Sequence, residues 1–273
     1  MPELPEVESL RRDLLQLLPD LVLVGVEIRY PPIVARPSPE EFCRRVEGRR
    51  VLDVGRRGKL LLLRLDSGET AALHRRMTGN LLLTQPTEPV DHHVHAVFRL
   101  ADGRQLRYRD PRKFGRLALL TPGEMVALDA ELGPEPLDPT FDAVAMAEVL
   151  RSAPGRGLKA LLLDQRRLAG LGNIYVDEAL WRAGLHPLRL AGSLAPDEVA
   201  ALQRAIRSVL EEGIAHRGTS LRDHLDPDGR PGSYQDYLQV VGRVGQPCRR
   251  CGAPLARAVV ASRGTVYCPA CQR

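Results

Sequence analysis

CRRCGAPLARAVVASRGTVYCPAC, residues 248–271, contains two Cys-x2-Cys pairs, Cys248/Cys251 and Cys268/Cys271, with sixteen residues between the pairs. Each pair can chelate a metal ion from a tight turn, and four thiolates form the closed tetrahedral site of a structural zinc. Two disulfides are the alternative, which a reducing cytosol disfavours. Because four cysteines leave no coordination position for water, the single predicted zinc ion stabilises a small β-hairpin and takes no part in catalysis.

Positive charge is concentrated in the same segment. The chain has 39 Lys and Arg against 34 Asp and Glu, a net charge of +5, and residues 248–273 contain five arginines and no acidic residue. Such a distribution is typical of a module that binds a polyanion, although a solvated basic tail has the same composition. Arg263-Gly264-Thr265 is predicted to form the turn of the hairpin. The chain has three lysines, which indicate positions that need a compact, titratable ammonium unless they are retained by chance: Lys59, Lys113 and Lys159.

Hydrophobic periodicity changes along the chain. Residues 3–18 have apolar residues at helical spacing, and residues 22–120 contain short apolar runs separated by turn signals. We therefore expect a β-sandwich or barrel with a helix laid against it. The segment 122–139 is rich in proline and acidic residues and is predicted to be an interdomain linker. From about residue 142 to 212 the periodicity is again helical.

Two observations concern the membrane. No apolar run approaches the ~20 residues needed to cross a bilayer. The N-terminus also lacks the hydrophobic core of a signal peptide. We therefore expect a cytoplasmic protein without a membrane partner, and nothing in the sequence requires more than a monomer.

The chain begins with Met1-Pro2-Glu3-Leu4-Pro5-Glu6. Trimming of the initiator Met would leave Pro2 as a free secondary amine, and an α-amino group with a pKa near ~8 is partly unprotonated at neutral pH. Such an amine can attack a carbonyl-like carbon and form a Schiff base, and Glu3 could act as its proton donor. The alternative is structural, because proline is favoured in the first turn of a helix.

A glycine-containing loop separates two predicted helices. Lys159 begins the first of them, and Gly170-Leu-Gly172-Asn173 precedes the second, where Asn173 is predicted to be the cap. A helix N-terminus of this kind can bind a phosphate through free backbone N–H groups. A simple turn between two helices is the alternative.

Several motifs along the chain together resemble the bacterial formamidopyrimidine-DNA glycosylase family, the 8-oxoguanine DNA glycosylase/AP lyases. In chain order they are PELPEVE at 2–8, RRGK at 56–59, H-x-x-M-x-G at 74–79, DPRKFG at 110–115, LDQ…GLGNIYVDEAL at 163–180 and the four-cysteine finger. The resemblance implies an α+β fold, in which an N-terminal β-sandwich with a packed helix precedes a helix–two-turn–helix domain and a zinc-finger hairpin. The domain boundaries expected from it are 1–121 for the sandwich, 122–141 for the linker, 142–240 for the helical domain with a lesion-covering loop at about 219–237, and 241–273 for the finger.

The resemblance also implies an activity and its residues. The chain would excise oxidised purines from double-stranded DNA through an N-terminal proline Schiff base and then cleave the strand by β,δ-elimination. The catalytic residues would be Pro2, Glu3, Lys59 and Arg263. The DNA contacts would come from His74, His93, Arg112, Arg156, Lys159 and Asn173. The gap left by the flipped base would be filled by Met77, Arg112 and Phe114, apolar or hydrogen-bonding side chains suited to a kinked base stack.

The chain departs from the family pattern at two positions. Arg75 stands where H-L-x-M-x-G has leucine, which bears on how the turn carrying Met77 is placed. Val241 stands where V-Y-G-R has tyrosine, so it cannot supply that hydroxyl to a phosphate.

Three alternative functions remain: an endonuclease VIII-like enzyme for oxidised pyrimidines, a non-catalytic zinc-ribbon DNA-binding protein, and a metal-dependent nuclease. A nuclease of that kind needs an open metal site, which the sequence does not offer. The expected partner is duplex DNA with oxidised bases or abasic sites, in the cytoplasm at the nucleoid.

Overall fold

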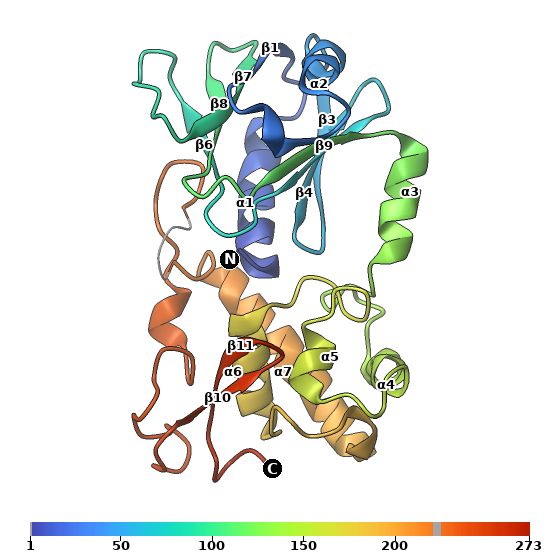
Figure 1. The fold of residues 1–273 in the computed structure, drawn as a ribbon, viewed down its shortest axis with the longest axis vertical. Coiled ribbons are helices and arrows are strands. Elements are labelled where there is room, and N and C mark those ends of the chain that lie inside the picture. Colours follow the sequence, from blue (N-terminus) through green and yellow to red (C-terminus); the bar gives the residue numbers. More distant parts are fainter. Residues whose placement is uncertain (1, 221–224) are drawn as a thin grey trace. The chain divides into compact units, whose positions relative to one another are not determined.

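The structure, a computed structural model, describes residues 2–220 and 225–273. These residues form two compact units (Figure 1). Unit 1 comprises the chain up to residue 130 together with 216–233, and unit 2 comprises 131–215 with 234–273. The predicted covering loop, 219–237, is thus divided between the units, and its residues 221–224 lie outside the described residues.

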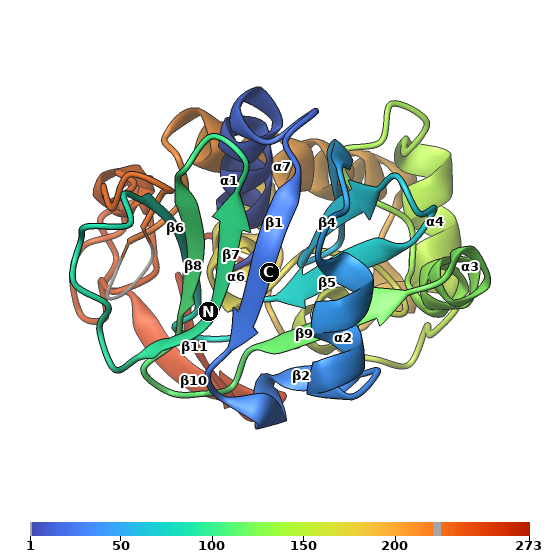
Figure 2. The same ribbon diagram turned by 90° about the horizontal axis from the view of Figure 1, so that it is seen from above.

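The described residues of unit 1 contain two sheets, three α-helices and one short 3-10 helix, η1. In chain order its elements are α1 (Leu4–Leu17), β1 (Leu23–Ile28), η1 (Pro31–Ile33), β2 (Val34–Arg36), α2 (Pro39–Val46), β3 (Val51–Arg57), β4 (Leu60–Leu65), β5 (Thr70–His74), β6 (Asn80–Thr84), β7 (Val94–Leu100), β8 (Gln105–Arg109), β9 (Arg116–Leu120) and α3 (Pro122–Glu131). One sheet has the strand order β1-β7-β8-β6, and the other has the order β2-β9-β5-β4-β3 (Figure 2). Apart from the parallel β2–β9 pair, the strands of both sheets pair antiparallel.

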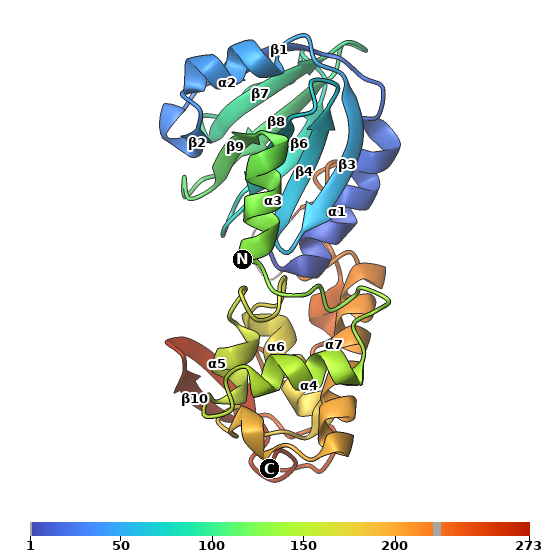
Figure 3. The same ribbon diagram turned by 90° about the vertical axis from the view of Figure 1, so that its right-hand side faces the viewer.

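The two sheets share one hydrophobic core. Phe98 and Tyr108 of the first sheet and Leu63 and Leu73 of the second are buried in the same cluster. Helix α1 adds one apolar face to this core, including Leu10, and packs along β3 (Figure 3). The predicted sandwich with a helix against it is therefore confirmed. Alternation along each strand explains this arrangement, because every second side chain points to the core.

Helix α3 occupies part of the segment predicted to be a linker. Its Met125 and Leu128 pack against Leu62 and Leu120, on the face of the second sheet that is turned away from the shared core. The linker prediction missed this helix because its apolar residues show no strong helical periodicity, although proline at position 122 stands at its first residue, where a missing N–H costs nothing.

Unit 2 is mainly helical. Its elements are α4 (Ala143–Arg151), α5 (Leu158–Leu162), α6 (Asn173–Ala183), η2 (Ala191–Ser193), α7 (Pro196–Ala215), η3 (Tyr234–Tyr237), β10 (Ala256–Val260) and β11 (Arg263–Tyr267). Asp142 caps α4 by accepting hydrogen bonds from the N–H groups of Val144 and Ala145, both at 2.9 Å. Helix α6 packs against α7 and β11. No helix in the described ranges is both long and apolar enough to span a membrane.

The turn between β10 and β11 is formed by residues 261 and 262, which precede the predicted turn. Val260 pairs with Arg263, and the two residues between them, Ala261 and Ser262, have φ angles of 51° and 58°. Positive φ at both central residues is the geometry of a two-residue hairpin turn that matches the twist of the strands. The prediction of a turn at Arg263-Gly264-Thr265 is therefore wrong, and Arg263 is the first residue of β11.

Candidate active site and nucleic-acid interface

The N-terminal residues lie at the start of α1. Pro2 is buried, and Glu3, which is 2% exposed, is the N-cap residue with extended backbone. Glu6 Oε2 accepts a hydrogen bond from the Glu3 N–H at 2.7 Å, and the two glutamates form a capping box. Pro5 occupies the first turn, where its missing N–H is not needed. The helix therefore fixes the backbone on which the predicted nucleophile and acid stand.

Lys59 lies in the turn between β3 and β4, and His74 ends β5, the strand that pairs with β4. Lys59, 8% exposed, follows Gly58, whose φ of 55° allows the tight turn between β3 and β4. Its neighbour Leu60 pairs with His74. Burial, followed by the charges of Arg76 and Lys59, lowers the pKa of His74 to about 4. His74 is therefore neutral at pH 7, and because Nδ1 accepts the Arg76 N–H at 3.0 Å, its proton is on Nε2, which can donate to an anion.

The predicted gap-filling residues stand on two turns of unit 1, which we call the first filler turn (75–79) and the second filler turn (110–115). Met77 is 41% and Phe114 46% exposed. Exposure on this scale shows that neither side chain belongs to the hydrophobic core. The Arg112 guanidinium carbon lies 4.8 Å from the centre of the Phe114 ring, so the two side chains form one cation–π pair.

Asp110, fully buried, joins the two filler turns. One carboxylate oxygen accepts hydrogen bonds from the Thr78 hydroxyl and from the Arg112 N–H, the latter at 3.2 Å. The other accepts from the Gly115 N–H at 2.8 Å and from the Tyr108 hydroxyl at 3.2 Å. Sequence reasoning assigned Asp110 no role, although its place at the start of DPRKFG is typical of a side chain that caps its own turn.

The two histidines of the H-x-H sequence have different surroundings. His93 precedes β7, is half-buried, and donates its N–H to Asp91 Oδ1 at 3.1 Å. His95 is buried within β7, where Nε2–H donates to the Asp110 carbonyl at 2.8 Å and its ring lies 5.2 Å from that of Tyr30. His95 is therefore enclosed, and of these two histidines His93 alone is accessible to a ligand.

Lys159 in unit 2 forms a buried ion pair. Its ammonium lies 2.6 Å from Asp177 Oδ1 and 3.2 Å from the Gly264 carbonyl, and the exposed fractions of the two charged side chains are 0% and 1%. Asp177 Oδ2 accepts the Val266 N–H at 3.2 Å. The structure therefore differs from the expected phosphate contact, because this ammonium is turned inward and joins α5 and α6 to the hairpin.

Asn173 is the first residue of α6, and Gly172, not Asn173, is its N-cap. The predicted cap is thus displaced by one residue, because the Asn173 side chain donates through Nδ2 to the Gly264 carbonyl at 3.0 Å. Its Oδ1 is buried and has no hydrogen-bond partner among the described residues. Arg156 and Arg263 are exposed, and the Arg156 guanidinium pairs with Asp164 at 2.7 Å.

Glu178 was not recognised in the sequence as a functional residue. Its buried carboxylate accepts three backbone N–H groups, from Gln239 at 2.8 Å, Val240 at 3.0 Å and Val241 at 3.0 Å. Burial raises the pKa of Glu178, and the three N–H groups oppose that effect. Position 241, where the family pattern has tyrosine, is therefore fixed through its backbone in this chain.

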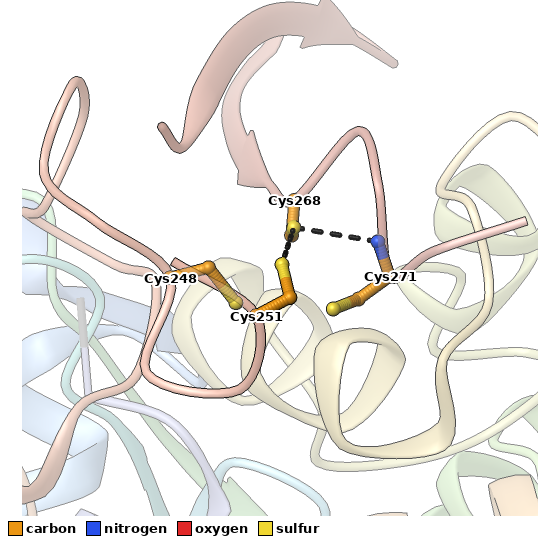
Figure 4. A group of neighbouring side chains, drawn as sticks. All are labelled: Cys248, Cys251, Cys268 and Cys271. Carbon is orange, nitrogen blue, oxygen red and sulfur yellow. Dashed lines mark hydrogen bonds between the residues drawn. The ribbon is translucent and has the colours of Figure 1, made fainter. Parts of the chain in front are cut away.

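The four cysteines of the finger come together as predicted (Figure 4). Their sulfur atoms lie within 4.8 Å of one another, with Cys251 Sγ and Cys268 Sγ 3.5 Å apart. This spacing suits four thiolates at the ~2.3 Å bond length of zinc, so the residues fit one structural zinc ion. The Trp181 indole N–H points to Cys248 Sγ at 3.4 Å, and this ring and two of the cysteines share a small core with Val240 and Leu255.

A second group of metal-ligating residue types occurs in the described part of the chain. It consists of Asp91, His92 and His93. Asp91 already forms an ion pair with Arg109. The hydrogen bond from the His93 N–H, followed by that from Arg109, lowers the pKa of its carboxylate to about 2. This group is therefore explained by local charge pairing.

Three family models match consecutive parts of the chain. They are the formamidopyrimidine-DNA glycosylase N-terminal domain at residues 1–117, the H2TH domain of the same family at 132–224, and the zinc finger found in FPG and IleRS at 245–273. These matches define a zinc-finger protein with a sandwich domain and a helix–two-turn–helix domain.

Relatives and solved structures give the same result. The chain is 50% identical to formamidopyrimidine-DNA glycosylase of Chloroflexus aggregans, covering 100% of this chain and 98% of the relative, and 47% identical to that of Pelotomaculum thermopropionicum, covering 100% and 99%. It also resembles the Lactococcus lactis enzyme in complex with Fapy-dG-containing DNA, with 36% identity, full coverage of both chains and a TM-score of 0.92. The chain belongs to the formamidopyrimidine-DNA glycosylase family.

Proposed function

We propose that this protein is a bifunctional DNA glycosylase and AP lyase that removes oxidised purines, 8-oxoguanine and formamidopyrimidines, from duplex DNA. The observation that carries the proposal is that Pro2 and Glu3 stand at the buried start of α1 in a chain that belongs to this family over its whole length. Solved relatives were determined with Fapy-dG, carbocyclic 8-oxoguanine and abasic-site DNA. They support the substrate class.

The first chemical step would use Pro2 as the nucleophile. Its secondary amine attacks C1′ of the damaged nucleoside, and the bond between C1′ and the base breaks as the base takes the electron pair. Glu3 would protonate the ring oxygen, which opens the sugar and leaves an iminium between Pro2 and C1′. Removal of Met1 is required for this step, because a peptide nitrogen cannot form the iminium.

Two eliminations would then cleave the strand. Loss of a proton from C2′ expels the 3′ phosphate, and loss of a proton from C4′ expels the 5′ phosphate. Lys59 is proposed to assist proton transfer and to hold a phosphate, and Arg263 is proposed to assist the second elimination. A cation beside a departing phosphate stabilises the developing negative charge.

The residues proposed to contact DNA fall into two groups, those that bind phosphates or the unpaired base and those that fill the gap in the base stack. His74, a neutral donor, and His93, Arg112, Arg156 and Asn173 are proposed to contact phosphates or the unpaired base. The first-turn N–H groups of α6 support a phosphate at that helix terminus. Lys159 is proposed to act at the same place through the strand that it supports, not through a direct contact. Met77, Arg112 and Phe114 would fill the gap left by the flipped base.

Borohydride trapping tests the nucleophile. The protein is incubated with an 8-oxoguanine:cytosine duplex and sodium borohydride, which reduces the iminium to a stable crosslink, and the crosslinked residue is mapped by mass spectrometry. We expect the crosslink at Pro2 and a mature chain that lacks Met1. Pro2→Gly should trap more slowly, whereas Pro5→Ala, a matched change in the same helix turn, should trap like the parent protein. Undiminished trapping in Pro2→Gly at a residue other than the N-terminus would refute the assignment.

The same assay separates the alternatives. Faster excision from an oxidised-pyrimidine duplex would favour endonuclease VIII-like specificity, and binding without any trapped complex would indicate a non-catalytic DNA-binding protein. Strand cleavage that is abolished by brief EDTA treatment, under conditions in which the structural zinc is retained, would indicate a metal-dependent nuclease. We also propose that the protein acts as a monomer in the cytoplasm at the nucleoid. Sedimentation with and without DNA tests the monomer.

A further inference from the structure

Arg75 is the largest fully buried side chain of the described residues, and the proposed function assigns it no role. Its guanidinium donates hydrogen bonds to three oxygen acceptors. Nε donates to the Gly79 carbonyl at 2.7 Å, Nη2 to Asn80 Oδ1 at 2.7 Å, and Nη1 to the Glu6 carbonyl at 3.4 Å. The planar fork of an arginine has fixed donor directions, so these bonds determine where their acceptors lie relative to one another.

Two of the three acceptors are on the consecutive residues Gly79 and Asn80, and the third is on Glu6 of α1. Gly79 ends the first filler turn, which Arg75 itself begins, and the Gly79 N–H closes that turn on the Arg75 carbonyl at 3.2 Å. Glu6 lies in the first turn of α1, the helix that places the nucleophile and its acid. Asn80 begins β6, and its Oδ1 also accepts the Leu225 N–H at 3.0 Å.

The site is built for a cation. Burial lowers the pKa of Arg75 to about 10, while the charge of Glu6 opposes this effect, so the guanidinium remains charged at neutral pH. Glu6 Oε1 in turn accepts the Thr219 N–H at 2.7 Å. A leucine, the residue of the family pattern, would supply no donor to these oxygens, and buried acceptors without donors are costly.

We infer that Arg75 is a positioning residue: it holds the first filler turn in a fixed place relative to the start of α1, and so determines how Met77 enters the base stack. This inference rests on the proposed role of Met77 as a gap-filling residue. Arg75 contacts neither the lesion nor the reacting atoms in this role, and its effect on excision is transmitted through Met77.

A double-mutant cycle tests the inference. Single-turnover excision is measured for Arg75→Met, Met77→Ala and the double variant on an 8-oxoguanine duplex, and strand cleavage is measured on a duplex with a preformed abasic site. We expect Arg75→Met to slow excision about tenfold or more and to slow abasic-site cleavage by no more than about threefold. In the Met77→Ala background the same change should cost less than about twofold, because interacting residues are not additive.

A spectroscopic readout separates positioning from a general loss of structure. A 2-aminopurine beside a non-cleavable abasic analogue reports unstacking of the DNA when the gap is filled. Arg75→Met should lower this fluorescence change, whereas Arg99→Met, which alters an exposed arginine paired with Glu27, should leave both the signal and excision unchanged. Melting curves establish that each variant is folded.

Each remaining outcome decides the question. Equal losses on both substrates, or losses that multiply in the double variant, would overturn the role of Arg75. If Met77→Ala alone leaves excision unchanged, the proposed role of Met77 fails and this inference fails with it, while trapping at Pro2 remains an independent test of the proposed function. If Arg75→Met does not fold, Arg75→Lys is put through the same cycle. It keeps the charge without the fork, and losses that multiply with Met77→Ala would again overturn the inference.

Discussion

Replacement of Lys159 by methionine would remove one partner of a fully buried ion pair in unit 2. The ammonium lies 2.6 Å from Asp177 Oδ1, and both side chains are at most 1% exposed. Removal of one partner of such a pair leaves an uncompensated buried charge and costs about 3–5 kcal/mol. With a urea m-value of about 2 kcal/mol/M, we expect the midpoint of unfolding to fall by about 2 M.

The stability lost in Lys159→Met should increase with pH. Burial raises the pKa of Asp177 to about 6, and Lys159 opposes that effect, so in Lys159→Met the pKa of Asp177 rises further. A carboxyl whose pKa is raised in the folded state contributes stability that is present below its unfolded value and is lost as pH rises through the folded value. The penalty of Lys159→Met should therefore be largest at pH 8 and fall to about 2 kcal/mol or less at pH 5, where Asp177 is neutral.

Tryptophan fluorescence is a suitable assay because the single tryptophan of the chain, Trp181, lies buried in unit 2. Lys113→Met is the matched control, since Lys113 is exposed and should cost less than about 1 kcal/mol. Asp177→Asn added to Lys159→Met should restore much of the loss at pH 8. A penalty equal to that of the control, or one that is the same at pH 5 and pH 8, would refute the reasoning.

Three further predictions concern other parts of the chain. Burial alone would raise the pKa of Glu8, but hydrogen bonds from neighbouring arginines lower it to about 2. Glu8→Gln should therefore destabilise the protein by about 1–2 kcal/mol at pH 7, after discounting for partial exposure. Urea unfolding followed by circular dichroism should show this loss of stability disappearing as pH falls from 4.5 toward 2. Chelation of zinc should change the fluorescence of Trp181, whose indole N–H meets a ligand sulfur, and should weaken DNA binding in a gel-shift assay; unchanged fluorescence after complete zinc removal would contradict this. Gly115→Ala would place a Cβ 1.6 Å from the Tyr108 hydroxyl oxygen, so it should cost about 1–3 kcal/mol and slow excision, whereas Gly123→Ala, with open space around it, should be neutral in both melting and excision assays.

Short-range sequence patterns predicted the secondary-structure elements that depend on residues close together in the chain. The apolar spacing of residues 3–18 predicted α1, and the short apolar runs of residues 22–120 predicted a region of strands, which contains β1 to β9. The four-cysteine spacing predicted a closed thiolate site, because chelation from two tight turns depends on residues that are close in sequence. Helix α3 was missed, since its apolar contacts with the sheet are not visible as a strong periodicity.

The sequence predicted most residues of the site but not the contacts that these residues make. Met77 and Phe114 were named through the family pattern, yet the side chain that joins their turns, Asp110, was not, because its link to the first filler turn depends on Thr78, which lies 32 residues earlier in the sequence. Lys159 was expected at the DNA surface, and its inward position follows from Asp177, eighteen residues away on the next helix. Hydrogen-bond partners of buried charges are chosen by packing, which a sequence pattern does not encode.

The family, the zinc ligands, the helix that begins after Glu3 and the side chains available for chemistry all follow from the amino-acid sequence. These depend on residue identity and on short-range spacing, which covalent geometry and secondary-structure periodicity translate directly into structure. Which charges are buried and which are exposed depends on how the chain packs in three dimensions. This packing turned Lys159 inward and placed the guanidinium of Arg75 between the start of β6 and the first turn of α1. The reason is that a buried charge must find its partners across the fold, where the low dielectric makes each unmatched group costly.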